Sequence, residues 1–185
     1  LVKEALKGAE EAGAEVEVIR LHDYNIKPCT GCNACVMSLF AQGGTGSCTI
    51  KDDDFAKIDD KIMECDGLIV GSPIYEKSPS GLLKNLNDRM GPSHDMAFRM
   101  TAKKVREAKG LTEGGPDERA FKHRAAALIA VGGSEWDQLA LPMLHLFTLS
   151  MHMDIVDKML VNWVALPGAM LFQEKAIARA HQDGI

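Results

Sequence analysis

Hydrophobic positions along the chain alternate between helical spacing and short continuous runs. Apolar residues recur at helical intervals over residues 1–9, and Gly13 stands where a helix commonly ends. Alternating residues over 14–21 predict a strand. Asp52 is expected to cap a second helix, whose buried face carries the apolar residues between 55 and 62. The chain is therefore expected to begin within a helix, with an upstream strand and loop preceding Leu1.

The second half of the chain alternates strand-length apolar runs with helical patterns. A continuous apolar run of this length is typical of a parallel strand that is covered on both faces. The predicted order is strand 67–71, helix 80–90, strand 125–131, helix 136–152, strand 156–163 and helix 173–181. This alternation predicts a single α/β domain over residues 1–185, with a doubly wound parallel sheet and ligands at the carboxyl ends of the strands.

Composition and charge limit the classes of protein to which this chain can belong. The 185 residues, 46% of them hydrophobic, suffice for one α/β core, and the formal net charge is −5. No lysine- or arginine-rich run is present, which argues against nucleic acid or an anionic membrane as a partner. No apolar stretch approaches the roughly 20 residues of a membrane span. We expect a cytoplasmic protein, in a reducing compartment that suits its five cysteines, four of which cluster between residues 29 and 48.

Four cysteines follow the first predicted strand with the spacing C-x2-C-x2-C-x12-C. They are Cys29, Cys32, Cys35 and Cys48. Thiolates three residues apart converge when the backbone turns tightly, so this motif predicts an iron–sulfur cluster. Two alternatives stay open: reduced thiols without metal, and a structural zinc site. Cys65 lies before a core strand and is expected to be a small core residue.

Two buried strands end in turns that are suited to a flat ligand. Ser72, Pro73, Ile74 and Tyr75 follow the first strand, and an aromatic residue at such an edge can pack on a ring. Gly132-Gly133 follows the next strand, where missing side chains let a ring or a phosphate approach the backbone. A simple strand-ending turn with a surface tyrosine is the alternative. Two such edges on adjacent strands favour one shared ligand.

These motifs, taken in order, resemble NADPH-dependent FMN reductases and, within them, the iron–sulfur flavoproteins. The resemblance rests on the cysteine motif, Lys51-Asp52-Asp53, Ser72-Pro73-Ile74-Tyr75, Leu83-Lys84-Asn85, Asp88-Arg89 and Gly132-Gly133, and it spans nearly the whole chain. It implies a flavodoxin-like fold, an FMN cofactor and assembly as a homodimer or homotetramer. The family's first strand and its phosphate-binding loop would precede Leu1, and the last cysteine gap is longer than in the compact family motif.

The resemblance also implies the roles of the site residues. Residues 72–75, with Gly132 and Gly133, would line the flavin, and the four cysteines of loop 28–48 would ligate a 4Fe–4S cluster. The expected function is an FMN-dependent, NAD(P)H-linked oxidoreductase that passes electrons between a reduced donor, FMN and the cluster. The alternatives are an electron-transfer flavoprotein that serves only a redox partner protein, a flavin-only reductase, and a cofactor-free or zinc-stabilised binding module.

Two further segments carry expectations. Lys84, Asp88 and Arg89 are interpreted mainly as a solvated helix face. The stretch 91–123 is too long for an ordinary connection and includes a helical pattern over 96–109. Its apolar residues need a surface to cover, so we expect this insertion over the flavin edge or against a neighbouring subunit, with Gly114-Gly115-Pro116 as a mobile turn.

Overall fold

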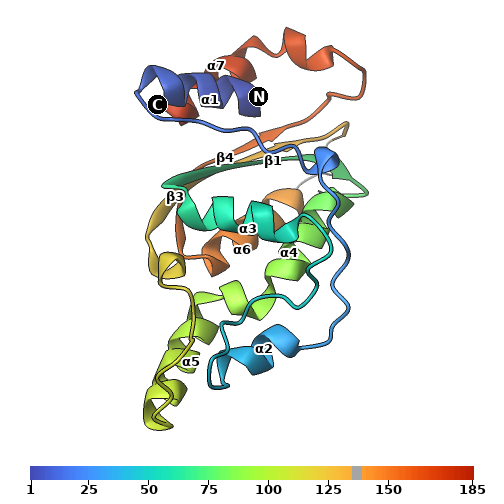
Figure 1. The fold of residues 1–185 in the computed structure, drawn as a ribbon. Coiled ribbons are helices and arrows are strands. Elements are labelled where there is room, and N and C mark those ends of the chain that lie inside the picture. Colours follow the sequence, from blue (N-terminus) through green and yellow to red (C-terminus); the bar gives the residue numbers. More distant parts are fainter. Residues whose placement is uncertain (135–138) are drawn as a thin grey trace.

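The computed structural model describes residues 1–134 and 139–185 and has an α/β architecture built on one sheet (Figure 1). Among these residues the sheet has four strands in the order β2-β1-β3-β4. The strands are β1 (Gly67–Tyr75), β2 (Ser78–Pro79), β3 (Arg124–Val131) and β4 (Met153–Val161). β1, β3 and β4 are parallel, and the short β2 folds back antiparallel on the end of β1. The predicted parallel sheet with covering helices is confirmed.

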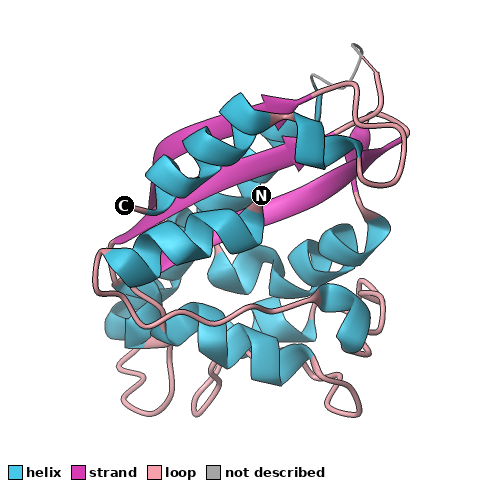
Figure 2. Cartoon of the chain, turned by 90° about the horizontal axis from the view of Figure 1, so that it is seen from above, coloured by secondary structure: helices cyan, strands magenta, loops and turns pink. Residues whose placement is uncertain are grey.

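Helices cover both faces of the sheet (Figure 1). α1 (Val2–Glu11) and α7 (Glu174–Gly184) lie on one face, whereas α3 (Phe55–Glu64), α4 (Gly81–His94) and α6 (Ala140–Ser150) lie on the other. Seen from above, the two terminal helices lie side by side over the strands (Figure 2). α2 (Ala34–Leu39) and α5 (Met96–Ala108) lie farther from the sheet, beyond α4. Three short 3-10 helices are also described, over Leu21–Asp23, Glu118–Phe121 and Ala169–Phe172.

Each face of the sheet has its own hydrophobic core. The larger core joins α3, α4 and α6 to the sheet, and the smaller joins α1 and α7 to it. Residues 126–130 of β3 are all buried, as expected for a central strand with both faces covered. α1 and α7 pack very closely, because Gly8 brings its backbone against the carbonyl of His181.

Several predicted boundaries need correction. The prediction of a strand over 14–21 was wrong, because none of the described strands pairs with this segment and a strand requires a hydrogen-bonded neighbour. Ile19 and Leu21 nevertheless pack against the larger core. The second helix begins at Phe55, whose N–H is accepted by Asp53 rather than by Asp52. The predicted start of the helix over 136–152 falls partly outside the described residues.

No helix in the described ranges is both long enough and apolar enough to cross a membrane.

Candidate functional site

The two turns singled out in the sequence lie next to each other at the carboxyl edge of the sheet. The parallel register of β1 and β3 sets Ser72 opposite Ala130 and Pro73 opposite Val131. The turn after β3 therefore starts beside the end of β1. In an open α/β sheet this edge is where ligands bind.

The end of β1 presents its aromatic residue to solvent. The Tyr75 side chain is 65% exposed. Ser72 is buried, and its hydroxyl donates to the Pro73 carbonyl and accepts from the Ser80 N–H, which fixes the start of α4. Ile74 packs against the larger core. Of the four predicted residues, Pro73 and Tyr75 are therefore the ones exposed to solvent, and contact with a flavin stays a prediction for all four.

The hairpin turn between β1 and β2 is strained. Glu76 and Lys77 both have positive φ angles, of 47° and 65°. Consecutive residues of this kind form a turn that favours asparagine and glycine, because other side chains crowd the backbone there. Such strain concentrates at functional sites. Its position directly after Tyr75 places it at the candidate ligand edge.

The two glycines after β3 have different environments. Gly132 is buried, and its N–H and carbonyl bond to Val161 and Val164 at the end of β4. Gly133 is exposed, and among the described residues a Cβ built on it would meet Ala165 at ordinary contact distance. Gly132 therefore ties β3 to β4, whereas Gly133 leaves the backbone at this edge uncovered.

The four motif cysteines line one small cavity of about 60 Å³. Cys29 and Cys32 are exposed, whereas Cys35 and Cys48 are partly buried, and all four are free thiols. The long last gap of the motif forms α2 and a turn, which return the chain so that Cys48 lies on the same cavity as the other three. The four cysteines that the spacing of the motif grouped together thus lie around one cavity in the structure.

A tight backbone turn shapes the first part of this loop. Gly31 and Asn33 have left-handed φ angles of 67° and 56°, and Asn33 directly precedes α2. The Gly31 N–H points to the Cys29 sulfur at 3.5 Å. The loop therefore wraps its backbone around the thiols, as a cluster-binding loop must.

The thiols differ in their ease of ionisation. The backbone N–H of Ala34, followed by nearby threonine hydroxyls, lowers the pKa of Cys32 below its usual value. Burial raises the pKa of Cys35, and the neighbouring Cys48 and Cys32 act in the same direction. Mutual repulsion of this kind is what a shared metal would relieve, since metal binding requires thiolates.

The donor set fits a thiolate-bound metal in its chemistry, although the side chains are not yet in a coordinating arrangement. Within residues 1–134 and 139–185, no three His, Cys, Asp or Glu side chains are positioned to hold a metal ion. Cys65 lies outside the cavity, at the end of α3, where its thiol donates to the Ile62 carbonyl. Burial raises the pKa of Cys65.

Arg89 was missed as a site residue by the sequence interpretation. Lys84 and Asp88 lie on the expected solvated helix face, where they form an ion pair, but the Arg89 side chain is 0% exposed. It lines the cysteine cavity and donates from Nε to the Cys48 sulfur at 3.2 Å. The signal was its spacing, because Arg89 follows the buried Leu86 by three residues and so falls on the same helix face.

The insertion 91–123 packs on the cysteine loop. The buried Arg106 of α5 donates to the carbonyls of Leu39 and Ala41 at the end of α2. The Phe40 and Phe98 rings meet edge to face at 5.9 Å. The expectation that this segment covers the flavin edge was wrong, because α5 lies at the end of the molecule away from the sheet (Figure 1). A contact with a neighbouring subunit stays a prediction.

The predicted mobile turn in this insertion is packed as well. The Gly43 N–H donates to the Glu113 carbonyl at 2.8 Å, and the Gly115 N–H donates to the Gly44 carbonyl at 2.7 Å. A Cβ on Gly114 would come within 2.5 Å of the Gly44 oxygen. Glycine is thus required here for close approach to the loop rather than for mobility.

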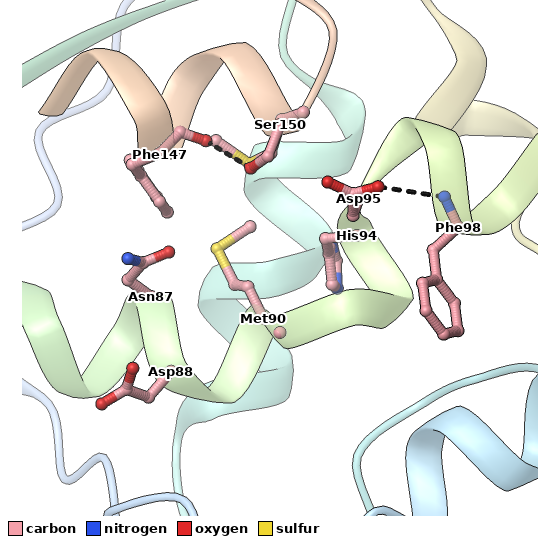
Figure 3. A pocket seen from close by; sticks show the side chains of 10 residues that line it. Asn87, Asp88, Met90, His94, Asp95, Phe98, Phe147 and Ser150 are labelled. Carbon is pink, nitrogen blue, oxygen red and sulfur yellow. Dashed lines mark hydrogen bonds between the residues drawn. The ribbon is translucent and has the colours of Figure 1, made fainter. Parts of the chain in front are cut away.

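A larger cavity of about 610 Å³ lies between α4, α5 and α6 (Figure 3). Met90 and His94 of α4 face Phe147 and Ser150 of α6 across it, and Phe98 of α5 lines its side. Ser150 and the residues after it lead into the amino end of β4. The cavity is therefore at the opposite edge of the sheet from the two turns.

Comparison with known proteins gives a family match over most of the chain. The sequence profile described as NADPH-dependent FMN reductase matches residues 1–166. A flavone synthase of Aspergillus candidus is 32% identical over 187 residues, which cover 97% of this chain and 56% of that protein. An iron–sulfur flavoprotein of Methanocaldococcus jannaschii is 44% identical over 92 residues, covering 50% of this chain and 44% of that protein.

A solved structure titled flavone reductase has a similar fold. It superposes with a TM-score of 0.77 at 31% identity, over 98% of this chain and 54% of that one. The fold is therefore flavodoxin-like, as the resemblance of the motifs implied. The chain spans about half the length of the curated relatives it matches, or less.

Proposed function

The chain belongs to the NADPH-dependent FMN reductase family, and from this membership we propose that it binds FMN at the carboxyl edge of its sheet and oxidises NAD(P)H. The observation that carries the site is the register of β1 and β3, which sets Pro73 opposite Val131 and so joins the two ligand-facing turns. Pro73, Tyr75 and Gly133 are exposed on these turns.

The protein residues at this edge position the flavin and do not need to transfer a proton. The exposed Tyr75 ring offers an apolar surface for the flavin, and Gly133 leaves room for the ring to approach the backbone. Gly132 and Ser72 hold the two turns in place through their own hydrogen bonds. FMN, when bound, supplies the exchange between hydride transfer and single-electron transfer.

We extend the proposal to a 4Fe–4S cluster on Cys29, Cys32, Cys35 and Cys48. Its support is the shared cavity of the four thiols, together with the similarity to iron–sulfur flavoproteins over half of the chain. Four thiolates are the ligand set that such a cluster uses. A zinc site and a metal-free loop are the alternatives, and the metal content of the protein separates them.

The acceptor and the assembly complete the proposal. A flavone is the acceptor to test first, because two matches over nearly the whole chain are named a flavone synthase and a flavone reductase. A redox partner protein is the alternative acceptor.

We expect a homo-oligomer, since Leu139, Leu146 and Leu149 leave exposed apolar surface on and beside α6. Light scattering of the purified protein measures its size.

The flavin site is tested by substitutions at Tyr75. Tyr75→Ala should weaken FMN binding about tenfold, because it removes an aromatic contact worth about 1–1.5 kcal/mol. Tyr75→Phe keeps the ring and should bind like the wild type. Flavin fluorescence quenching gives the dissociation constants, and NAD(P)H oxidation gives the activity. Unchanged affinity in the alanine variant would place the flavin elsewhere.

The cluster is tested by anaerobic reconstitution followed by iron and acid-labile sulfide analysis. The wild type should contain about four irons per chain if one such cluster forms. Cys32→Ala should lower the iron content, whereas Cys65→Ala should leave it unchanged because Cys65 lies outside the cavity. An iron-free wild type that binds FMN and oxidises NAD(P)H would establish the flavin-only alternative.

A further inference from the structure

Arg89 stands out among the residues of the cysteine cavity because it carries a completely buried charge. Its side chain and that of Asp53 are 0% and 1% exposed, and the two form an ion pair. The guanidinium also lies over the Phe55 ring, 4.5 Å from its centre. A buried ion pair persists only when its remaining hydrogen-bonding atoms are satisfied.

The remaining donors of Arg89 all reach the cysteine loop. Nη1 donates to the Lys27 carbonyl at 2.9 Å, just before the first cysteine. Nη2 donates to the Ile50 carbonyl at 3.1 Å, just after the last cysteine. One guanidinium thus joins the two ends of the loop, which the rigid fork of arginine can do and the point charge of lysine cannot.

The last donor meets a motif cysteine directly. Nε of Arg89 lies 3.2 Å from the sulfur of Cys48. Hydrogen bonds and positive charge at a ligand sulfur stabilise the more negative, reduced form of an iron–sulfur cluster.

We propose that Arg89 is a positioning residue for the cysteine site, which closes loop 28–48 and raises the reduction potential of the cluster through its N–H···S bond to Cys48. This inference rests on the proposed cluster. It adds a residue from α4 that is not itself a ligand, and it predicts an effect on potential separate from metal binding.

Arg124 offers a matched control. It is also a buried arginine, and it donates to the backbone carbonyls of Met63, Cys65 and Arg119 rather than to the cysteine loop. Arg89→Lys and Arg124→Lys therefore make the same chemical change at a buried site. Both substitutions keep the positive charge and remove the planar, branched guanidinium group.

The experiment measures iron content and the cluster midpoint potential, by EPR-monitored redox titration, in reconstituted wild type and both variants. Arg89→Lys should have a more negative midpoint potential than the wild type, whereas Arg124→Lys should match the wild type. A second variant, Arg89→Met with Asp53→Asn, removes the N–H···S bond without changing the net charge. Its potential should fall as well.

The outcomes separate this inference from the proposed function. Iron-loaded variants at Arg89 with the wild-type potential would refute the inference and leave the cluster standing. Loss of iron from both Arg89 variants, with Arg124→Lys still loaded, supports the closing role. Equal loss of iron from the Arg89 and Arg124 variants overturns it, because folding alone would then explain both. A wild type without iron would refute the cluster itself.

Discussion

Replacing Gly8 by alanine tests the contact between the two terminal helices, because two physical effects predict opposite signs. Gly8 lies inside α1, where alanine is favoured over glycine by about 1 kcal/mol of intrinsic helix propensity. Propensity alone therefore predicts a more stable protein. Packing predicts the reverse, since a Cβ at this position would lie 2.0 Å from the carbonyl oxygen of His181.

The size of the effect follows from the atoms involved. A carbon and a carbonyl oxygen normally approach to about 3.3 Å, so the helices must separate by more than an ångström. The obstacle is backbone, which cannot turn aside as a flexible side chain would. Separation would loosen the small core around Ala5 and Ala180. Overpacking costs about 1–3 kcal/mol, and a clash with backbone falls at about 2–3 kcal/mol, so we expect Gly8→Ala to lower the free energy of unfolding by about 1–2 kcal/mol after the propensity gain of about 1 kcal/mol.

Urea unfolding at neutral pH measures this change, and Gly81→Ala provides the control. Gly81 is the first residue of α4, and a Cβ there would meet no atom within 4 Å. The control should be neutral or stabilised by up to about 1 kcal/mol. A Gly8→Ala protein as stable as the wild type, with the same slope of unfolding free energy against urea concentration, would contradict this reasoning. The close contact of α1 and α7 would then not limit residue 8 to glycine.

Two further predictions concern stability. Replacing Glu76-Lys77 by Asn-Gly should raise the free energy of unfolding by about 1–2 kcal/mol, because both residues have positive φ; a turn without strain would show no gain. Burial and the nearby Asp157 raise the pKa of Asp183 from 3.8 to about 6. The folded state thus holds this proton more tightly than the unfolded state, and stability falls as pH rises through that interval. Asp183→Asn should add about 1–2 kcal/mol at pH 7 and little at pH 4 in urea titrations, whereas an equal gain at both would contradict the titration.

The sequence identified the fold well where hydrophobic runs are long. The runs over 67–71 and 125–131 became the paired strands β1 and β3, because a continuous apolar run of strand length is typical of a strand covered on both faces. The pattern over 14–21 looked equally clear and was wrong. Alternation describes which side chains are buried, whereas strand formation depends on a neighbour that no local pattern reveals.

At the candidate site, too, local patterns were predicted from the sequence, whereas contacts between distant residues were missed. Cysteine spacing predicted that the thiols converge, and all four line one cavity, since the three close thiols need only a local turn; their ligation of a cluster stays a prediction. Arg89 was mistaken for a surface residue, because charge on a helix usually faces water. Its partners Lys27, Ile50 and Asp53 are all more than 30 positions away, so only the folded chain brings them together.

The long cysteine gap and the long insertion are two parts of one structural feature. The gap adds α2, which ends at Leu39, so the Leu39 carbonyl has no helical partner of its own. Arg106 of the insertion donates to this carbonyl and to that of Ala41, and Gly115 pairs with the turn that follows. Without α5 the buried Leu39 carbonyl would lose its hydrogen bond from Arg106, which is costly away from water, whereas the Ala41 carbonyl would keep the one from the Gly44 N–H. The loop can therefore keep its extra residues, and still return Cys48 to the cavity, because the insertion lies against it.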